Sequence, residues 1–259
     1  MKKSLVPFCL TLIIFIGSAG VSWGADSQKV GPFDKYHENG KLALKATWKD
    51  GKWEGPFERY YENGKLESKG TYKDGKYVGP WFFYRKNGKL KSKATYKDGK
   101  KNGPYVSYRK NGKLDLKGIR KHDKWEGLLE RYDRNGKVYN KETYKDGKMD
   151  GPYVSYHDNG KLEKEGIYKD GKRIGLWSFY YPKGYLKTKT TYKDGKENGP
   201  HLSYRRENGK LSSKGIVKGD NREGPWIYYN RDGTIDKSLT GNYKNDVRVS
   251  DLNPLNSDL

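Results

Sequence analysis

The chain has 259 residues, with 54 Lys and Arg against 32 Asp and Glu and a formal net charge of +22. Its hydrophobic content of 32% excludes a thick core of aliphatic side chains, because globular domains usually have close to half of their residues apolar. High charge with low hydropathy is typical of disorder, but 23 Tyr, 7 Trp and 7 Phe argue against it. Rings that need only half-burial favour a thin sheet.

The N-terminal segment differs from the rest of the chain. Two lysines precede an apolar stretch over residues 5–19, and SWG at 22–24 supplies small residues for cleavage before Ala25. These features predict a signal peptide over residues 1–24, export to the periplasm or the medium, and a short linker over 25–30. An uncleaved membrane anchor is the alternative. Against it, the stretch is shorter than the ~20 residues that a spanning helix needs, and Pro7 interrupts it.

The only cysteine, Cys9, lies in this segment. The mature chain is therefore expected to have neither disulfides nor thiol chemistry.

From residue 31 onward the sequence repeats every 24 residues. Each unit opens with a glycine, usually followed by proline, and the ninth unit starts one residue late because 204–210 carries an extra residue. The opening glycines are Gly31, Gly55, Gly79, Gly103, Gly127, Gly151, Gly175, Gly199 and Gly224. We predict nine units over residues 31–246 and a loose C-terminal tail over 247–259.

Two turn signals divide each unit. Asn-Gly, as at Asn63-Gly64, is followed by Asp-Gly, as in the YKDGK string at 72–76. Both pairs tolerate positive φ and are typical of hairpins, and the 6–9 residues between turns suit strands and not helices. The prediction is an all-β fold: an elongated, single-layer antiparallel sheet of about nine β-hairpin repeats, roughly 85 Å long at ~4.8 Å per strand. Proline after the opening glycine fits a strand start.

The register can also be predicted. Tyr lies five residues after each opening glycine and an aliphatic residue follows six later, as in Tyr60 and Leu66. A three-residue loop that ends in a left-handed glycine pairs the two directly, and we prefer it to a two-residue loop. Period-two alternation then puts Leu66, Gly70 and Tyr72 on one face, in a continuous aromatic-aliphatic stripe.

Residues 119–129 depart from the pattern. Arg120 replaces the stripe Tyr, His122-Asp123 replaces Asp-Gly, and Leu128 replaces proline. Sequence drift explains the departure most simply, and a kink or a partner contact in the middle of the array is the alternative.

The string G-P-aromatic, Tyr-x-x-Asn-Gly-Lys-Leu and Tyr-Lys-Asp-Gly-Lys resembles the MORN-repeat variant family of bacteria. The resemblance covers nearly the whole mature chain and implies an elongated hairpin sheet. Some members of that family are antitoxin or immunity proteins, and related eukaryotic repeats are proposed to bind acidic phospholipids and to scaffold protein assemblies, so the resemblance implies these roles as alternatives. It transfers no catalytic motif.

The residues themselves give no support for catalysis. The four histidines are dispersed, no His, Asp or Glu cluster has metal-ligand spacing, and a single-layer sheet offers few pockets. We therefore predict a non-enzyme without metal, cofactor or small-molecule substrate.

Lysines recur beside both turns, as at Lys41, Lys49, Lys65 and Lys73. One interpretation is a solvated surface that prevents aggregation of a long sheet. The other is attraction to an anionic envelope surface or an acidic protein. Nucleic acid is disfavoured because export is predicted and the lysines alternate with turn aspartates.

Candidate partner-binding residues are large rings at positions that vary between units, either after the proline or after the Asp-Gly turn. Interfaces favour such rings on an open face, although packing between neighbouring hairpins is the alternative. The candidates are Trp53, Tyr77, Trp81, Trp125, Trp177 and Trp226.

The predicted function is that of an exported, non-catalytic repeat scaffold that binds a protein or an envelope surface. An antitoxin that neutralises a toxin, and a module that binds anionic lipid, are the alternatives.

Overall fold

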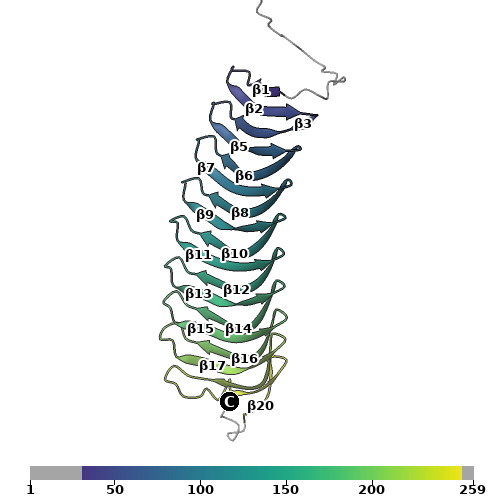
Figure 1. Cartoon of the computed structure of the whole chain (residues 1–259). Coiled ribbons are helices and arrows are strands. Elements are labelled where there is room, and N and C mark those ends of the chain that lie inside the picture. Colours follow the sequence, from purple (N-terminus) through teal and green to yellow (C-terminus); the bar gives the residue numbers. More distant parts are fainter. Residues whose placement is uncertain (1–30, 253–259) are drawn as a thin grey trace, which may run out of the picture.

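The computed structural model describes residues 31–252, which form a single open antiparallel sheet of 20 strands. In Figure 1 the strands stack one after another along the long axis of the molecule, and hairpin turns line its two sides. The predicted all-β hairpin array is confirmed. The predicted signal peptide, the linker over 25–30 and residues 253–259 lie outside the described residues.

The strands have the following bounds. They are β1 (Gly31–Tyr36), β2 (Leu42–Lys49), β3 (Lys52–Trp53), β4 (Gly55–Tyr60), β5 (Leu66–Lys73), β6 (Lys76–Tyr84), β7 (Leu90–Lys97), β8 (Lys100–Tyr108), β9 (Leu114–Lys121), β10 (Lys124–Tyr132), β11 (Val138–Lys145), β12 (Lys148–Tyr156), β13 (Leu162–Lys169), β14 (Lys172–Tyr180), β15 (Leu186–Lys193), β16 (Lys196–Tyr204), β17 (Leu211–Lys218), β18 (Asn221–Tyr228), β19 (Gly241–Lys244) and β20 (Val247–Ser250).

The two turns of a unit have different geometry. At the Asp-Gly turn between β5 and β6, both Asp74 (φ 51°) and Gly75 (φ 74°) are left-handed, as a two-residue hairpin turn requires. At the Asn-Gly loop only the glycine is left-handed, with φ 83° at Gly64. Tyr60 pairs directly with Leu66 around that loop. The three-residue loop predicted from the sequence is therefore confirmed.

A bulge follows each Tyr–Leu pair and overturns the predicted stripe. Arg59 pairs with Ser68 while Tyr60 pairs with Leu66, so Glu67 is the extra residue. Because a bulge adds one residue to the count, the alternation reverses beyond Leu66. The aliphatic residue therefore lies on the face opposite Gly70 and Tyr72, and does not continue their stripe.

A second irregularity occurs at most Gly-Pro pairs. Gly79 is left-handed at φ 66°, and the pairing of β5 with β6 skips from Thr71–Val78 to Lys69–Phe82. Pro80 thus lies at a bulge within β6, whereas the first two prolines of the array follow the opening residues of β1 and β4, as predicted for a strand start. A bulge tolerates proline because the missing N–H is not needed in the ladder there.

The sheet has two unlike faces. The ring face carries the residue after each Gly-Pro pair, including Trp81 and Trp177, which are both 0% exposed. The opposite face carries the prolines themselves, with the residues that pair with them, such as Pro80 with Thr95. We call it the proline face. The two clusters of buried rings therefore lie on the ring face, in keeping with the low aliphatic content, while few side chains, such as Ile227, are buried on the proline face.

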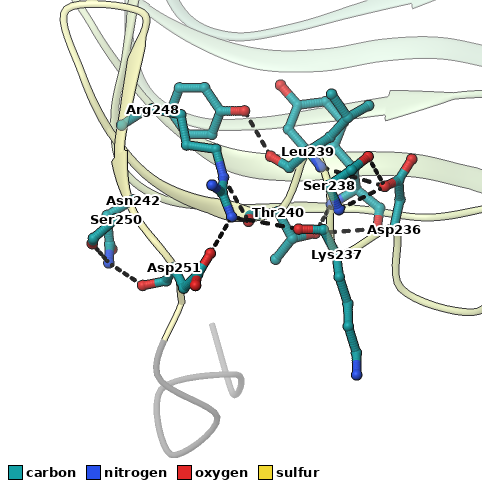
Figure 2. Close-up of polar contacts among 11 residues, drawn as sticks. Asp236, Lys237, Ser238, Leu239, Thr240, Asn242, Arg248, Ser250 and Asp251 are labelled. Carbon is teal, nitrogen blue, oxygen red and sulfur yellow. Dashed lines mark hydrogen bonds and ion pairs between the residues drawn. The ribbon is translucent and has the colours of Figure 1, made fainter.

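The described part of the predicted tail is ordered. Val247–Ser250 is strand β20, which pairs with β19, so the predicted loose tail is corrected for these residues. Figure 2 shows how Arg248 folds over this end, donating hydrogen bonds to Thr240 O from Nε (3.0 Å) and Nη2 (2.8 Å). Arg248 also contacts Lys237 O and the Asp251 carboxylate. These bonds close the last hairpin, a role that sequence periodicity could not disclose.

The atypical segment 119–129 keeps the sheet continuous. His122 (φ 49°) and Asp123 (φ 67°) adopt the turn conformation that Asp-Gly adopts elsewhere. The Arg120 guanidinium lies 3.4 Å from the ring centroid of Trp125, where an earlier unit has an edge-on contact between Tyr72 and Tyr77. β9 still pairs with β10 in this segment, so the substitutions do not interrupt the sheet.

Candidate binding surfaces

All six candidate rings lie on the ring face, where most take part in internal packing. The side chains of Trp81 and Trp177 are 0% exposed and that of Trp226 is 4% exposed. The expectation that these three stand on an open face is therefore corrected. Trp53, Tyr77 and Trp125 are half-buried. Contact of any of the six with a partner stays a prediction.

The two candidate positions are halves of one contact. The residue after the Asp-Gly turn covers the ring four residues later, across the Gly-Pro bulge. Tyr77 stacks on Trp81 with centroids 3.7 Å apart, and the Arg173 guanidinium lies 4.7 Å from the Trp177 ring. We call the covering residue the lid. Sequence reasoning missed this pairing because the bulge that brings the two together was not predicted.

Each buried indole also needs a glycine beneath it. A Cβ built on Gly70 would lie 2.2 Å from Trp81, one on Gly166 would lie 2.2 Å from Trp177, and one on Gly215 would lie 2.3 Å from Trp226. None of these three glycines has positive φ, so the requirement is one of space and not of conformation. The indole Nε1 then donates to the next carbonyl, as from Trp177 to Ile167 O at 3.2 Å. The three tryptophans are thus built in as structural elements.

One unit places a polar cluster where the others stack rings. His201 Nδ1 lies 2.9 Å from Glu197 Oε2, and His201 Nε2 lies 3.0 Å from Ser203 Oγ. With the proton on Nδ1, the histidine donates to Glu197 and accepts from Ser203. Glu197 also accepts from Tyr192 and Thr190. The hydrogen bond from His201, foremost, lowers the pKa of the Glu197 carboxyl against the opposing effect of burial.

This cluster is the lid contact in polar form. Glu197 occupies the lid position and His201 the ring position, so their bond replaces an aromatic stack. A carboxylate with this many donors is held in its charged state and is suited to fixing the histidine. The arrangement therefore serves to stabilise the eighth unit.

A hollow of about 1020 Å³ lies on the ring face beside β1 and β4. Its wall includes Phe33, Trp48, Trp53 and Tyr72, with the Arg59–Glu67 ion pair at its edge. Phe33 is 39% exposed, whereas Trp81 at the same position two units later is fully covered. Among the six candidates, Trp53 alone lines this hollow, so it is the one best placed to meet a ligand.

The proline face carries a series of exposed lysines. Lysines that flank each Asp-Gly turn pair directly across the two strands, and the side chains are exposed. We call these residues the lysine ladder. It comprises Lys49–Lys52, Lys73–Lys76, Lys97–Lys100, Lys121–Lys124, Lys145–Lys148, Lys169–Lys172 and Lys193–Lys196, and Lys218, which pairs with Asn221.

Like charges directly opposite each other destabilise a sheet, so the ladder opposes folding at every turn. The aspartate of each turn, such as Asp74, offsets part of the repulsion. A lysine paired with a glutamate would keep the surface equally hydrated without that cost. A repeated local conflict of this kind is typical of a functional surface.

Within residues 31–252, no group of three or more His, Cys, Asp or Glu side chains is arranged to hold a metal ion. In the same part of the chain, the structure contains no helix long and apolar enough to cross a membrane.

The chain is similar to one in the crystal structure of TcdB2-TccC3-Cdc42, at 12% identity and a TM-score of 0.22, over 81% of this chain and 13% of that one. The chain thus spans about an eighth of the length of that relative. Among curated proteins, no sequence matches it. The family described as MORN repeat variant matches six segments, 29–50, 53–74, 77–98, 125–146, 149–170 and 173–194. These segments amount to half of the sequence, so the chain belongs to the MORN repeat variant family.

Proposed function

We propose that the protein is a non-catalytic scaffold that binds an anionic partner along its proline face. The observation that carries the proposal is the lysine ladder, in which seven exposed Lys–Lys pairs recur, six at the Asp-Gly turns and one at His122-Asp123. Two strands per unit put successive pairs roughly 10 Å apart. Such an array suits a long anionic surface better than a compact ligand.

The proposal includes export, so the partner is an envelope surface or a secreted protein. The charged segment, apolar stretch and cleavage pattern over residues 1–24 support it. The non-catalytic character of MORN repeats agrees with a scaffold role.

Replacement of four ladder lysines tests the proposal. The variant Lys97→Gln/Lys100→Gln/Lys121→Gln/Lys124→Gln is titrated against polyglutamate and against vesicles with and without anionic lipid. Affinity for the anionic probe should fall at least tenfold, and the dependence of affinity on salt should become shallower, because fewer charges meet the probe.

A variant with the same charge change elsewhere is the control. Lys86, Lys110, Arg134 and Lys183 are exposed in or beside the Asn-Gly loops, at the other side of the sheet. Their replacement by Gln should change affinity less than threefold. Equal losses in the two variants would mean that only net charge matters, and the ladder would lose its assigned role.

A further inference from the structure

A row of exposed aliphatic side chains runs along the proline face from the fourth to the eighth unit. Ile119, Ile167 and Ile216 are 49%, 47% and 36% exposed. Leu128 and Leu176, in the units between them, are 50% and 52% exposed. We call these five residues the aliphatic row.

The row is not a requirement of folding. At the isoleucine position other units have threonine, as at Thr71 and Thr95, and at the leucine position they have proline. Residues needed by every hairpin recur every 24 positions, whereas Ile119, Ile167 and Ile216 are 48 and 49 residues apart. The longer period equals four strands, or roughly 19 Å along the sheet. It begins only after unit three, so it marks one region of the array.

A hollow closes the C-terminal end of the row. It has a volume of about 220 Å³ and is lined by Pro200, Leu202, Ile216, Pro225 and Ile227, among others. Ile216 belongs to both the row and the hollow, and monomeric proteins rarely leave large apolar surfaces bare.

The lysine ladder lies beside the aliphatic row, so a partner that covers the row has to be negatively charged. Lys121, Lys169 and Lys218 follow the three isoleucines by two residues, so they lie on the same face in the same strands. A second copy of the chain, itself at +22, would bring a second ladder toward the first. An apolar centre beside a charged margin is the usual build of a protein interface.

We propose that the aliphatic row docks an acidic protein segment, whose apolar side chains lie on the row while its carboxylates meet the lysine ladder. This proposal rests on the proposed scaffold function and names the partner class. Electrostatic contact with the lysine ladder would not by itself distinguish one polyanion from another. Apolar contact with the aliphatic row is what selects an acidic protein segment over a simple polyanion.

The test uses the full chain and three synthetic 24-residue peptides, followed by fluorescence anisotropy. One peptide has leucines at helical spacing among glutamates, the second has serine in place of leucine, and the third has lysine in place of glutamate. The first peptide should bind at least tenfold more tightly than either of the others. The variant Ile119→Thr/Ile167→Thr/Ile216→Thr should lose that advantage, and should keep its circular dichroism because threonine already occupies this position in other units.

The matched control is Ile235→Thr/Val247→Thr/Val249→Thr, which replaces three exposed aliphatic residues outside the row. It should bind the leucine–glutamate peptide within twofold of the unmodified chain. Unchanged binding in the row variant would overturn the proposal. So would a row variant that loses affinity for vesicles of anionic lipid and not for the peptide, since lipid would then be the occupant. The serine–glutamate peptide has no leucine to meet the aliphatic row, so its binding to the four-lysine variant of the ladder tests the scaffold proposal alone. The two proposals can therefore fail separately.

Discussion

At the scale of single residues, the core of this protein depends on the distance between a ring and the backbone beneath it. Gly70, Gly166 and Gly215 each precede a buried tryptophan by 11 residues. At the corresponding position Ala46 precedes Phe57, and Ala94 precedes Tyr105. The larger the ring, the smaller the residue below it.

This matching predicts a reciprocal mutational effect. Gly166→Ala should lower the free energy of unfolding by about 1–3 kcal/mol, because the added Cβ overlaps the Trp177 indole. The double variant Gly166→Ala/Trp177→Tyr should recover part of that loss, since it reproduces the combination of Ala94 and Tyr105. Urea denaturation of the single and double variants measures the coupling. Strict additivity of the two substitutions would contradict the packing explanation.

The Glu197–His201 contact predicts a dependence of stability on pH. Because the hydrogen bond from His201 lowers the pKa of Glu197 in the folded protein, the charged carboxyl stabilises the fold above the unfolded pKa of about 4.5. That contribution should be lost as the pH falls through the lower folded value. Glu197→Gln should therefore reduce the free energy of unfolding at pH 7 by about 1 kcal/mol, and the difference from the unmodified protein should shrink below pH 4.

Thermal denaturation of both proteins between pH 3 and pH 8 checks this prediction. The other carboxylates are common to the two chains, so the difference isolates Glu197. A difference that stays constant over the whole range would show that the charge of Glu197 does not contribute.

At the scale of elements, the Asn-Gly loops bind one another and do more than reverse the chain. Asn63 Nδ2 donates to Lys86 O in the next loop at 2.7 Å, while Asn63 Oδ1 accepts from Lys65 N in its own loop at 3.0 Å. The Lys65 Nζ reaches Asn87 O at 3.0 Å. The two histidines that share a unit position act alike, since the Nε2 atoms of His37 and His157 contact the Tyr carbonyls of the following units at 2.9 Å.

The asparagine donation to the next loop also occurs at Asn39, Asn111 and Asn159. The ninth unit differs, because its loop has Asp232 in place of asparagine and Asp232 Oδ1 accepts from Thr234 N within the loop.

The variant Asn63→Asp separates the two roles of the loop asparagine. Aspartate keeps the acceptor for Lys65 N and removes the donor to Lys86 O, so the turn should persist while the contact between units weakens. We expect a loss of about 1 kcal/mol, confined to the neighbouring hairpins. Native-state hydrogen exchange should show faster exchange in β4, β5 and β6 and unchanged exchange in β16 and β17. Uniform acceleration along the whole chain would contradict a local contact.

At the scale of the whole molecule, stability is expected to be distributed along the array. Within residues 31–252, the main strand contacts join strands of the same or of adjacent hairpins, so energies should add between neighbours, with the ends acting as caps. The C-terminal end is closed by Arg248 over the carbonyl of Thr240 (Figure 2).

Arg248→Ala should therefore open the last hairpin and leave the centre intact. Amides of β19 and β20 should exchange faster, whereas those of β10 and β11 should not, because no contact connects Arg248 with them. Arg231→Ala, at an exposed position of the adjoining turn, is the control. X-ray scattering should in both cases give an elongated particle of roughly 85 Å. A global loss of protection would contradict additivity between neighbours.

The sequence by itself determined the architecture, because the 24-residue period, the two turn signals and the Tyr–Leu register are local properties that each hairpin repeats. It also identified the lysines beside the turns. Only the tertiary structure decided which residues share a face, since the bulge beside each Tyr–Leu pair shifts the alternation by one residue and no hydrophobic period in the sequence reveals it. For that reason the candidate Trp81, Trp177 and Trp226 proved to be covered. The lysine pairs and the aliphatic row likewise became visible only once strands from different units lay side by side.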